Sequence, residues 1–214
     1  MSKFKELFKF DKGCSTQTKH SIRTSGPPCR QKQRSVSQTK REIVQKELND
    51  MLSLGVICKS RSAYSSPVVL VKKPDNKRRF CVDYRELNSI TKSDNYPVPG
   101  VQERLSGLKG AKYFIKLDLF AGYWQILITE EDIPKTTFIA NGQLYEFIVM
   151  PFGLETAPAT FQRMMDEVLE GLIDKGVLVY LDDVLIYEDN IELLYKRLET
   201  VLQRLKVSNL HIRD

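Results

Sequence analysis

The most restrictive feature of the chain is a pair of adjacent aspartates, Asp182 and Asp183, inside an apolar run. Residues 177 to 187 read Val-Leu-Val-Tyr-Leu-Asp-Asp-Val-Leu-Ile-Tyr. β-Branched and aromatic residues on both sides predict a β-hairpin with the two acids at its tip. One interpretation is that the pair only forms the turn, because aspartate is a favoured turn residue. The other is that two carboxylates in an apolar setting, which repel each other and resist desolvation, hold a divalent cation.

A third acid, Asp118, strengthens the interpretation as a metal site. It ends a strand-like run, Tyr-Phe-Ile-Lys-Leu-Asp, at residues 113 to 118. If this strand and the hairpin are neighbours, the three acids converge, and their carboxylate oxygens suit magnesium or manganese. Two such ions roughly 3.5 to 4 Å apart can clamp the attacking and leaving oxygens of a phosphoryl transfer. The three acids therefore indicate the chemistry that polymerases use.

Charge is unevenly distributed along the chain. The 214 residues carry a net charge of +6, but residues 1 to 41 hold 11 Lys or Arg against 2 acids, which gives +9, and the remainder carries −3. We predict that residues 1–40 form a basic leader, flexible or extended. Such a leader either lies along a polyanion or is a solvated tail without a specific role.

A second basic cluster surrounds a predicted turn at residues 74–76. Strand-like runs lie on both sides of it, at residues 68–71 and 80–84. One interpretation is a hairpin that binds phosphate groups, and the other is an ordinary charged surface. The cluster consists of Lys72, Lys73, Lys77, Arg78 and Arg79.

Composition argues against several other classes of protein. With 42% hydrophobic residues the chain can bury one sizeable core or two small lobes. It has neither the roughly 20 apolar residues of a membrane span nor a signal-peptide run at its start, so we expect an intracellular protein that is not secreted. The four cysteines are widely spaced, and we expect free thiols. With no Walker or His-Glu-x-x-His motif and only two histidines, both near the ends, a histidine-based mechanism is not indicated.

Hydrophobic periodicity predicts an α+β fold in which helices alternate with hairpins. The predicted helices lie at residues 39–54, 157–172 and 191–207, with a short one before Gly110. Four positions spaced as on one face are the expected core of the first helix: Val44, Leu48, Met51 and Leu52. Residues 88–100 are expected to form a loop. Further strands are expected at residues 123–128, 136–140 and 144–149, the last two joined by the tight-turn pair Asn141-Gly142.

Nine short stretches carry a resemblance to a known family. They are Leu-Gly-Val-Ile (54–57), Ser-Pro-Val-Val-Leu-Val-Lys-Lys (66–73), Cys-Val-Asp-Tyr-Arg-Glu-Leu-Asn (81–88), Phe-Ile-Lys-Leu-Asp-Leu (114–119), Gly-Tyr-Trp-Gln-Ile (122–126), Leu-Tyr-Glu-Phe (144–147), Met-Pro-Phe-Gly-Leu (150–154), Ala-Pro-Ala-Thr-Phe-Gln (157–162) and Tyr-Leu-Asp-Asp (180–183). A bare Tyr-x-Asp-Asp is a weak signal, but in this order the stretches resemble the reverse transcriptase of a gypsy-type LTR retrotransposon. The resemblance spans residues 42 to about 205.

The resemblance implies the fingers and palm of a right-hand polymerase, with an antiparallel palm sheet packed on helices and the thumb absent. The reverse transcriptase region would be residues 41–214, with fingers at about 41–108 and part of 125–155 and palm at about 109–124 and 156–214. Asp118, Asp182 and Asp183 would be catalytic and, with the backbone carbonyl of Leu119, would hold two Mg²⁺ ions, or Mn²⁺.

Further roles follow from the same resemblance. The ring of Tyr123 would lie under the deoxyribose and exclude a 2′-hydroxyl, although from its own surroundings it reads as a core aromatic. The dNTP-binding residues would be Lys72, Arg79, Ala121, Gly122, Tyr123 and Phe152. The residues near template or primer would be Gly153, Gln162 and Tyr180.

The implied reaction is nucleotidyl transfer from a dNTP to the 3′-hydroxyl of a primer on an RNA or DNA template. The partners would be the other domains of a Pol polyprotein: thumb, ribonuclease H and integrase. The protein would be in the cytoplasm and in particles, and no membrane would be involved. One alternative stays open because the chain stops at Asp214, before the expected thumb: a truncated, non-catalytic relic that at most binds nucleic acid. Another is a viral RNA-dependent RNA polymerase, against which Tyr123 argues, because an RNA-making enzyme accepts the 2′-hydroxyl.

Overall fold

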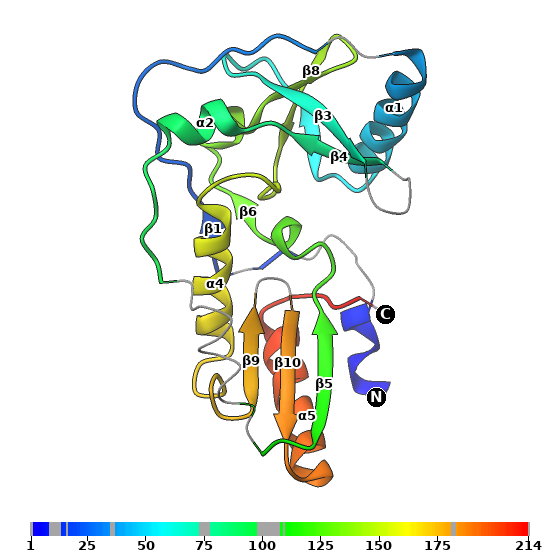
Figure 1. Cartoon of the computed structure of the whole chain (residues 1–214), viewed down its shortest axis with the longest axis vertical. Coiled ribbons are helices and arrows are strands. Elements are labelled where there is room, and N and C mark those ends of the chain that lie inside the picture. The colour runs from blue at the N-terminus through cyan, green and yellow to red at the C-terminus, as the bar shows by residue number, and fades with distance from the viewer. Residues whose placement is uncertain are drawn as a thin grey trace. The chain divides into compact units, whose positions relative to one another are not determined.

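The chain folds into helices and short strands that group into two units. The computed structural model describes residues 2–8, 14–15, 17–34, 37–72, 78–97, 108, 110–180 and 183–213. Unit 1 comprises Met1–Thr18, Asn95–Ile126 and Pro158–Asp214, and unit 2 comprises Lys19–Asp94 and Leu127–Ala157. Each unit combines helices with a β-sheet (Figure 1), so the predicted α+β class is confirmed.

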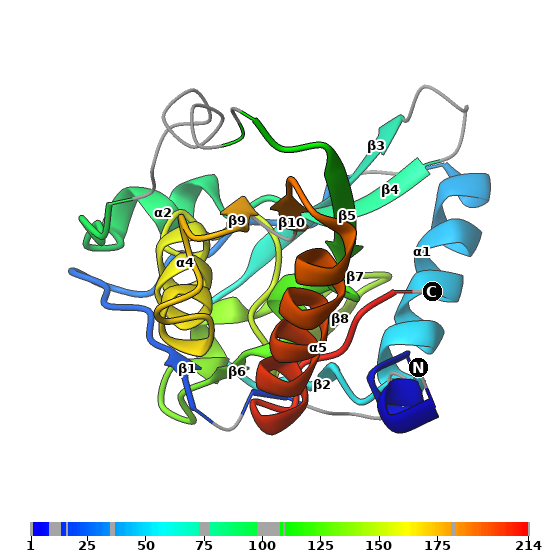
Figure 2. The same ribbon diagram turned by 90° about the horizontal axis from the view of Figure 1, so that it is seen from below.

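Unit 1 is built on a three-stranded antiparallel sheet in the order β5-β10-β9. Helix α5 packs against β10 and β5 and covers one face of the sheet (Figures 1 and 2). Val184 and Ile186 of β10 are fully buried. The elements of this unit are η1 (Ser2–Phe8), β5 (Tyr113–Asp118), η3 (Gly122–Gln125), α4 (Ala157–Val168), β9 (Val177–Tyr180), β10 (Asp183–Glu188) and α5 (Ile191–Val207).

Helix α5 has the bounds that the sequence predicted, Ile191–Val207. Its start is fixed by Asn190, whose side-chain oxygen accepts hydrogen bonds from the backbone N–H groups of Glu192 and Leu193, at 2.7 and 3.3 Å. Lys206 lies in the last turn, where a positive charge interacts favourably with the helix dipole. The apolar face is buried and consists of Leu194, Leu198, Val201, Leu202 and Leu205.

Helix α4 begins where predicted but ends at Val168, before the predicted end at residue 172. Residues 169–172 form turns instead, and Gly171 has a φ of +77°, a left-handed conformation that glycine adopts readily. Phe161 and Met165, which lie on one face of the helix, are fully buried.

The first residues of the chain pack within unit 1. Phe4 and Leu7 of η1 are buried. The backbone carbonyl of Leu7 accepts a hydrogen bond from the N–H of Ile212 at 2.9 Å, and Lys206 pairs with Glu6 at 3.1 Å. This stretch of the basic leader therefore contacts the C-terminal segment of the same unit.

Unit 2 contains a five-stranded sheet in the order β2-β8-β7-β3-β4 and a parallel pair of short strands, β1 and β6. Rings in the sheet pack on one another, with Phe138 5.7 Å from Phe80 and 5.3 Å from Phe147 between centroids. The elements are β1 (Lys19–His20), α1 (Gln38–Ser53), β2 (Ile57–Lys59), β3 (Ser66–Lys72), β4 (Arg78–Val82), α2 (Arg85–Ile90), β6 (Leu127–Ile128), η4 (Ile133–Thr136), β7 (Phe138–Ala140) and β8 (Gln143–Phe147).

Several predictions for unit 2 are confirmed and others are wrong. The turn at Asn141-Gly142 joins β7 to β8 with φ values of +48° and +79°, as a tight hairpin turn requires. Leu52 is 37% exposed and is not core, because it lies at the edge of the helix face that Val44, Leu48 and Met51 define.

Two boundaries near these elements were also predicted wrongly. The expected strand at residues 136–140 starts at Phe138, because Ile133–Thr136 forms a 3₁₀ helix with Pro134 in its first turn. Residues 88–90, expected in a loop, are the end of α2. The short helix expected before Gly110 falls mostly on residues 98–107 and 109, which lie outside the described residues.

Two predictions from composition can be compared with the structure. The four cysteines are free thiols, as expected. Within the described part of the chain, every helix is too short or too polar to span a bilayer.

Candidate active site

Asp118 and Asp183 lie directly opposite each other on neighbouring strands. Asp118 is the last residue of β5 and Asp183 the first residue of β10, and the antiparallel register pairs the two. Side chains in such directly opposed positions have Cβ atoms about 4.5–5.5 Å apart. The prediction that the strand ending at Asp118 is a neighbour of the hairpin is therefore confirmed. Asp182 lies outside the described residues, so its side chain is not placed.

The two carboxylates share the accessible face of the sheet. Alternate residues of a strand point to the same face, so Lys116 and Asp118 share a face with the directly opposed Asp183. The opposite face carries the fully buried Val184. The side chains of Asp118 and Asp183 are 41% and 43% exposed, which leaves room for an ion or a substrate to reach their oxygens.

Each carboxylate has a cationic partner. Lys116 Nζ lies 2.8 Å from Asp183 Oδ2, and Arg213 Nη1 lies 3.1 Å from Asp118 Oδ2. The hydrogen bond to Asp183 raises the pKa of the Lys116 ammonium group, which keeps it charged. The sequence prediction did not include either cation. Lys116 could have been found, because it precedes Asp118 by two residues on the same strand, whereas nothing local links Arg213 to Asp118.

The C-terminal segment holds the residues after Asp118 in place. The backbone N–H of Arg213 donates to the carbonyl of Asp118 at 2.8 Å, and that of Phe120 donates to the carbonyl of His211 at 3.0 Å. Leu119, expected to offer its carbonyl to a metal ion, is buried and bridged to Ile212. The backbone at the metal-ligand positions is therefore fixed by residues that lie far along the chain.

Gln125 joins these two segments through its side chain. Its amide nitrogen donates to the carbonyls of Phe120 and His211 at 2.8 and 3.0 Å, and its amide oxygen accepts from the N–H of His211 at 2.6 Å. The residue is fully buried, so these bonds replace those that water would have made. Gln125 is a positioning residue that the sequence prediction missed.

The expected strand at residues 123–128 is wrong in its first half. Ala121 has a φ of +46°, and Gly122–Gln125 forms the 3₁₀ helix η3, so only Leu127–Ile128 is a strand. Tyr123 lies in η3 and is 8% exposed, with its ring centroid 5.5 Å from that of Phe161. Three expected dNTP-binding residues, Ala121, Gly122 and Tyr123, therefore lie in a left-handed turn and the 3₁₀ helix that follows it.

Two residues expected near template or primer differ in accessibility. Tyr180 ends β9 and is 38% exposed. Gln162 is buried in α4, and its amide nitrogen donates to Asp166 at 2.8 Å. Asp166 also accepts a hydrogen bond from the hydroxyl of Tyr96 at 2.8 Å. Tyr180 is therefore open to a ligand, whereas Gln162 is held in a side-chain network.

The two strands predicted on either side of the basic turn pair with each other in unit 2, as β3 (Ser66–Lys72) and β4 (Arg78–Val82). Strands β3 and β4 pair so that Lys72 is opposite Arg78 and Val71 is opposite Arg79. Lys72, Arg78 and Arg79 are exposed. The remaining cations of the cluster, Lys73 and Lys77, lie with the predicted turn outside the described residues.

Asp83, directly after β4, binds two arginines. Arg85 donates from Nε and Nη2 to the two carboxylate oxygens at 2.8 and 2.7 Å, and Arg34 donates to Oδ2. The hydrogen bonds from Arg85 lower the pKa of Asp83 to about 2. Asp83 therefore stays ionised and holds both cations near the end of the basic hairpin.

Phe152 and Gly153, expected near nucleotide and template, lie in a turn of unit 2. Phe152 is 50% exposed. Gly153 has a φ of +98°, and a Cβ atom there would lie 3.4 Å from the carbonyl oxygen of Val82. The side chain of Asn88 accepts from the N–H of Glu155 at 3.1 Å and donates to the carbonyl of Gly153 at 2.9 Å. Gly153, through its backbone conformation, and Asn88, through its two hydrogen bonds, together stabilise this turn. The sequence prediction did not assign a role to Asn88.

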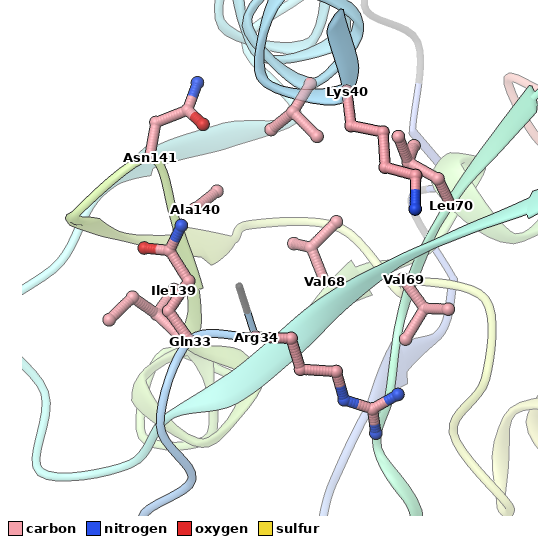
Figure 3. A pocket seen from close by; sticks show the side chains of 10 residues that line it. Gln33, Arg34, Lys40, Val68, Val69, Leu70, Ile139, Ala140 and Asn141 are labelled. Atoms are coloured by element: carbon pink, nitrogen blue, oxygen red, sulfur yellow. The ribbon is translucent and has the colours of Figure 1, made fainter. Parts of the chain in front are cut away.

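A pocket of about 150 Å³ lies in unit 2 among α1, β3 and β7 (Figure 3). Its walls are mainly apolar, with the polar ends of Gln33, Arg34, Lys40 and Asn141 around it. None of the described residues that line the pocket is an acid, so they offer no carboxylate to a metal ion. Its apolar lining is Val44, Val68, Val69, Leu70, Ile139 and Ala140.

The carboxylates of unit 1 fit a divalent metal in their chemistry. Among the described residues no group of three or more His, Cys, Asp or Glu side chains is arranged to hold a metal ion, and the third expected acid, Asp182, is outside that set. Asp118 and Asp183 nevertheless offer paired, accessible oxygen ligands, which hard cations such as Mg²⁺ prefer.

Comparisons with known proteins identify the family. Residues 71–214 match the family model described as reverse transcriptase (RNA-dependent DNA polymerase). The chain is 41% identical over 200 residues to the retrovirus-related Pol polyprotein from transposon 297 of Drosophila melanogaster. This alignment covers 91% of the chain and 19% of the polyprotein. It is 40% identical over 177 residues to that from transposon gypsy of the same organism, covering 80% of the chain and 17% of the polyprotein.

A solved structure extends the likeness to the fold. The foamy viral protease-reverse transcriptase in complex with RNA/DNA hybrid is 25% identical and has a TM-score of 0.90 over 99% of this chain and 29% of its own. This likeness confirms the predicted right-hand fingers and palm fold. The chain spans no more than 19% of the two transposon polyproteins. Because the family model matches more than half of its residues, the chain belongs to the reverse transcriptase (RNA-dependent DNA polymerase) family.

Proposed function

We propose that this chain is the fingers and palm region of an RNA-directed DNA polymerase, which transfers a nucleotide from a dNTP to the 3′-hydroxyl of a primer. The observation that carries the proposal is the pairing of Asp118 with Asp183 on the accessible face of the unit 1 sheet. The complex of the foamy viral relative with RNA/DNA hybrid supports a primed RNA or DNA template as the substrate. We assign the palm to about residues 109–124 and 156–214, and the fingers to about 41–108 and part of 125–155.

Asp118, Asp182 and Asp183, with the carbonyl of Leu119, would hold two Mg²⁺ ions, for which Mn²⁺ could substitute. Bound there, the ions would lower the pKa of the primer hydroxyl and offset the negative charge of the phosphates. The strand register places Asp118 opposite Asp183, so the two carboxylates that would bind the ions lie close together. The bonds from the N–H of Arg213 to the carbonyl of Asp118 and from the N–H of Phe120 to the carbonyl of His211 tie the residues after Asp118 to the C-terminal segment.

The basic hairpin of unit 2 would bind the triphosphate. Lys72 and Arg79 lie on its paired strands with exposed side chains, and guanidinium and ammonium groups are suited to phosphate oxygens. The exposed ring of Phe152 would pack against the nucleotide, and Gly153 would leave room for the template strand beside it. Specificity for sequence would come from base pairing to the template, with the protein contacting shape and backbone.

The residues after Asp118 would select the sugar. Tyr123 is held against Phe161, so its ring has little freedom to move away from a ribose 2′-hydroxyl. Ala121 and Gly122 would line the same side of the nucleotide. Tyr180 and Gln162 would lie near the primer and template. We also propose that the chain works within a Pol polyprotein, as the lengths of its relatives suggest. Its location in the cytoplasm and in particles is part of the same proposal.

A primer-extension assay tests this function. The full chain is incubated with Mg²⁺, dTTP and poly(rA)/oligo(dT), and addition of the first nucleotide is scored, because this step needs no movement along the template. We expect addition by the wild-type chain and none by Asp182→Asn. The matched control is Asp174→Asn, since residue 174 has a φ of +61°, which asparagine tolerates, and this variant should add nucleotides normally.

Filter binding of the same duplex is measured in parallel. Binding without nucleotide addition by the wild-type chain would support a relic that only binds nucleic acid and would contradict the proposal. Undiminished addition by Asp182→Asn would contradict it as well. Incorporation of ribonucleotides as fast as deoxyribonucleotides would point to an RNA-making polymerase instead.

A further inference from the structure

Both described carboxylates of the candidate site carry a cation of the chain itself. Lys116 reaches Asp183 from two residues before Asp118 on β5, and Arg213 reaches Asp118 from the C-terminal segment. The contacts are crossed: the lysine on the strand of Asp118 pairs with the carboxylate of the other strand. Each carboxylate therefore has one positive charge at ion-pair distance, at 2.8 and 3.1 Å.

These two cations offset a specific electrostatic cost. Two carboxylates in directly opposed strand positions repel each other, which destabilises the pairing of β5 with β10 at its end. An ion pair on each carboxylate removes this repulsion when no other cation is near. Lys116 and Arg213 thus offset the negative charge of the two carboxylates, as a divalent ion would do on binding.

Both cationic side chains are largely exposed, although the guanidinium of Arg213 also lies 6.0 Å from the ring centroid of Phe120. Their side chains are 61% and 58% exposed, so water can replace the carboxylate as their partner. The backbone N–H of Arg213 remains bonded to the carbonyl of Asp118 whatever the side chain does. The exchange therefore needs only side-chain rotation.

We propose that Lys116 and Arg213 are built-in counter-ions, which occupy Asp183 and Asp118 in the metal-free chain and which a divalent cation must displace. The proposal rests on the proposed function for the identity of the ion. The pair sets how much divalent cation the site needs, because every binding event breaks two ion pairs. Removing either positive charge therefore makes metal binding tighter, whereas residues that only position the carboxylates would make it weaker when lost.

Titration of the full chain with Mn²⁺ alone tests this, with free Mn²⁺ followed by its electron paramagnetic resonance signal. Because exposed ion pairs are worth little, Lys116→Gln and Arg213→Gln should each bind Mn²⁺ tighter on the order of two- to fivefold. The control Lys196→Gln removes a charge from the exposed face of α5 and should bind as the wild type does. Asp118→Asn should weaken binding, which locates the ion at this site.

Charge-preserving variants guard against misfolding. Lys116→Arg and Arg213→Lys should keep the wild-type affinity, and circular dichroism should show the same fold for all variants. Unchanged or weaker Mn²⁺ binding by both glutamine variants would overturn the proposal. No nucleotide enters this titration, so a chain that fails to extend a primer but shows tighter binding by the variants would refute the proposed function and leave this inference standing.

Discussion

Asp118 and Asp183 face each other across the antiparallel pair of β5 and β10, and each accepts an ion pair from a different cation. Two adjacent aspartates at a hairpin tip would not by themselves make a metal site, because a turn explains them equally well. The register makes the difference, since β10 pairs with β5 on one edge and β9 on the other. Strand β10 therefore fixes Asp183 opposite Asp118, and the two carboxylates lie at the same end of the sheet.

Loss of the Gln125 side chain should destabilise unit 1. Gln125→Leu removes three buried hydrogen bonds to the backbone of Phe120 and His211, so the free energy of unfolding should fall by about 3 kcal/mol. Urea unfolding followed by circular dichroism measures the change. The matched control is Gln162→Leu, another buried glutamine, whose one hydrogen bond among the described residues goes to the carboxylate of Asp166. Because this partner is charged, the variant should lose about 1.5 kcal/mol, half of the loss in Gln125→Leu. Equal losses in the two variants would count against a positioning role for Gln125.

Removal of the Tyr123 ring should relax sugar selection. Tyr123→Val shortens the side chain that would exclude the 2′-hydroxyl, so the ratio of ribonucleotide to deoxyribonucleotide addition should rise at least about tenfold. Tyr123→Phe keeps the ring and its contact with Phe161 and should keep the wild-type ratio. The ratio is measured by single-nucleotide addition with each substrate, and an unchanged ratio in Tyr123→Val would show that another group selects the sugar.

Unit 2 should lose stability in mild acid because of His20. This residue is fully buried, and burial lowers the pKa of its imidazole from 6.5 to about 4. Between these values the unfolded chain takes up a proton that the folded chain does not, so stability is lost as the pH falls from about 6.5 towards 4. From pH 7 to pH 5 the free energy of unfolding should drop by about 2 kcal/mol on this account. His20→Gln should remove most of that dependence in urea unfolding at the two pH values, and the same drop in both proteins would assign it to other groups.

Much of the fold could be predicted from local sequence. The hydrophobic periodicity predicted both ends of α5, and Asn141-Gly142 predicted the β7–β8 turn. The strand expected at residues 123–128 failed because Tyr123 to Ile128 is apolar enough for either conformation. What decides is the left-handed turn at Ala121 together with the side-chain bonds of Gln125 to a segment 86 residues away, and a local pattern contains neither.

The candidate site divides in the same way. The strand-like residues around Asp118 and Asp183 predicted that the two acids would meet if their strands were neighbours. The structure shows that β5 and β10 are neighbours and that the two acids are directly opposed. Lys116 lay within reach of the same reasoning through the two-residue period of a strand. Arg213 did not, because 95 residues separate it from Asp118 and only the tertiary fold brings them together.

The central claim is that the accessible carboxylates of unit 1 drive nucleotide addition. Mg²⁺-dependent addition of one dTTP to oligo(dT) on poly(rA) should be lost in Asp118→Asn by at least about a thousandfold, as expected when several kcal/mol of metal-assisted charge stabilisation disappear. Binding of the duplex should persist in the variant, because Asn keeps the size of the side chain and the backbone bonds of the strand. Addition by Asp118→Asn at a rate close to that of the wild-type chain would contradict the account.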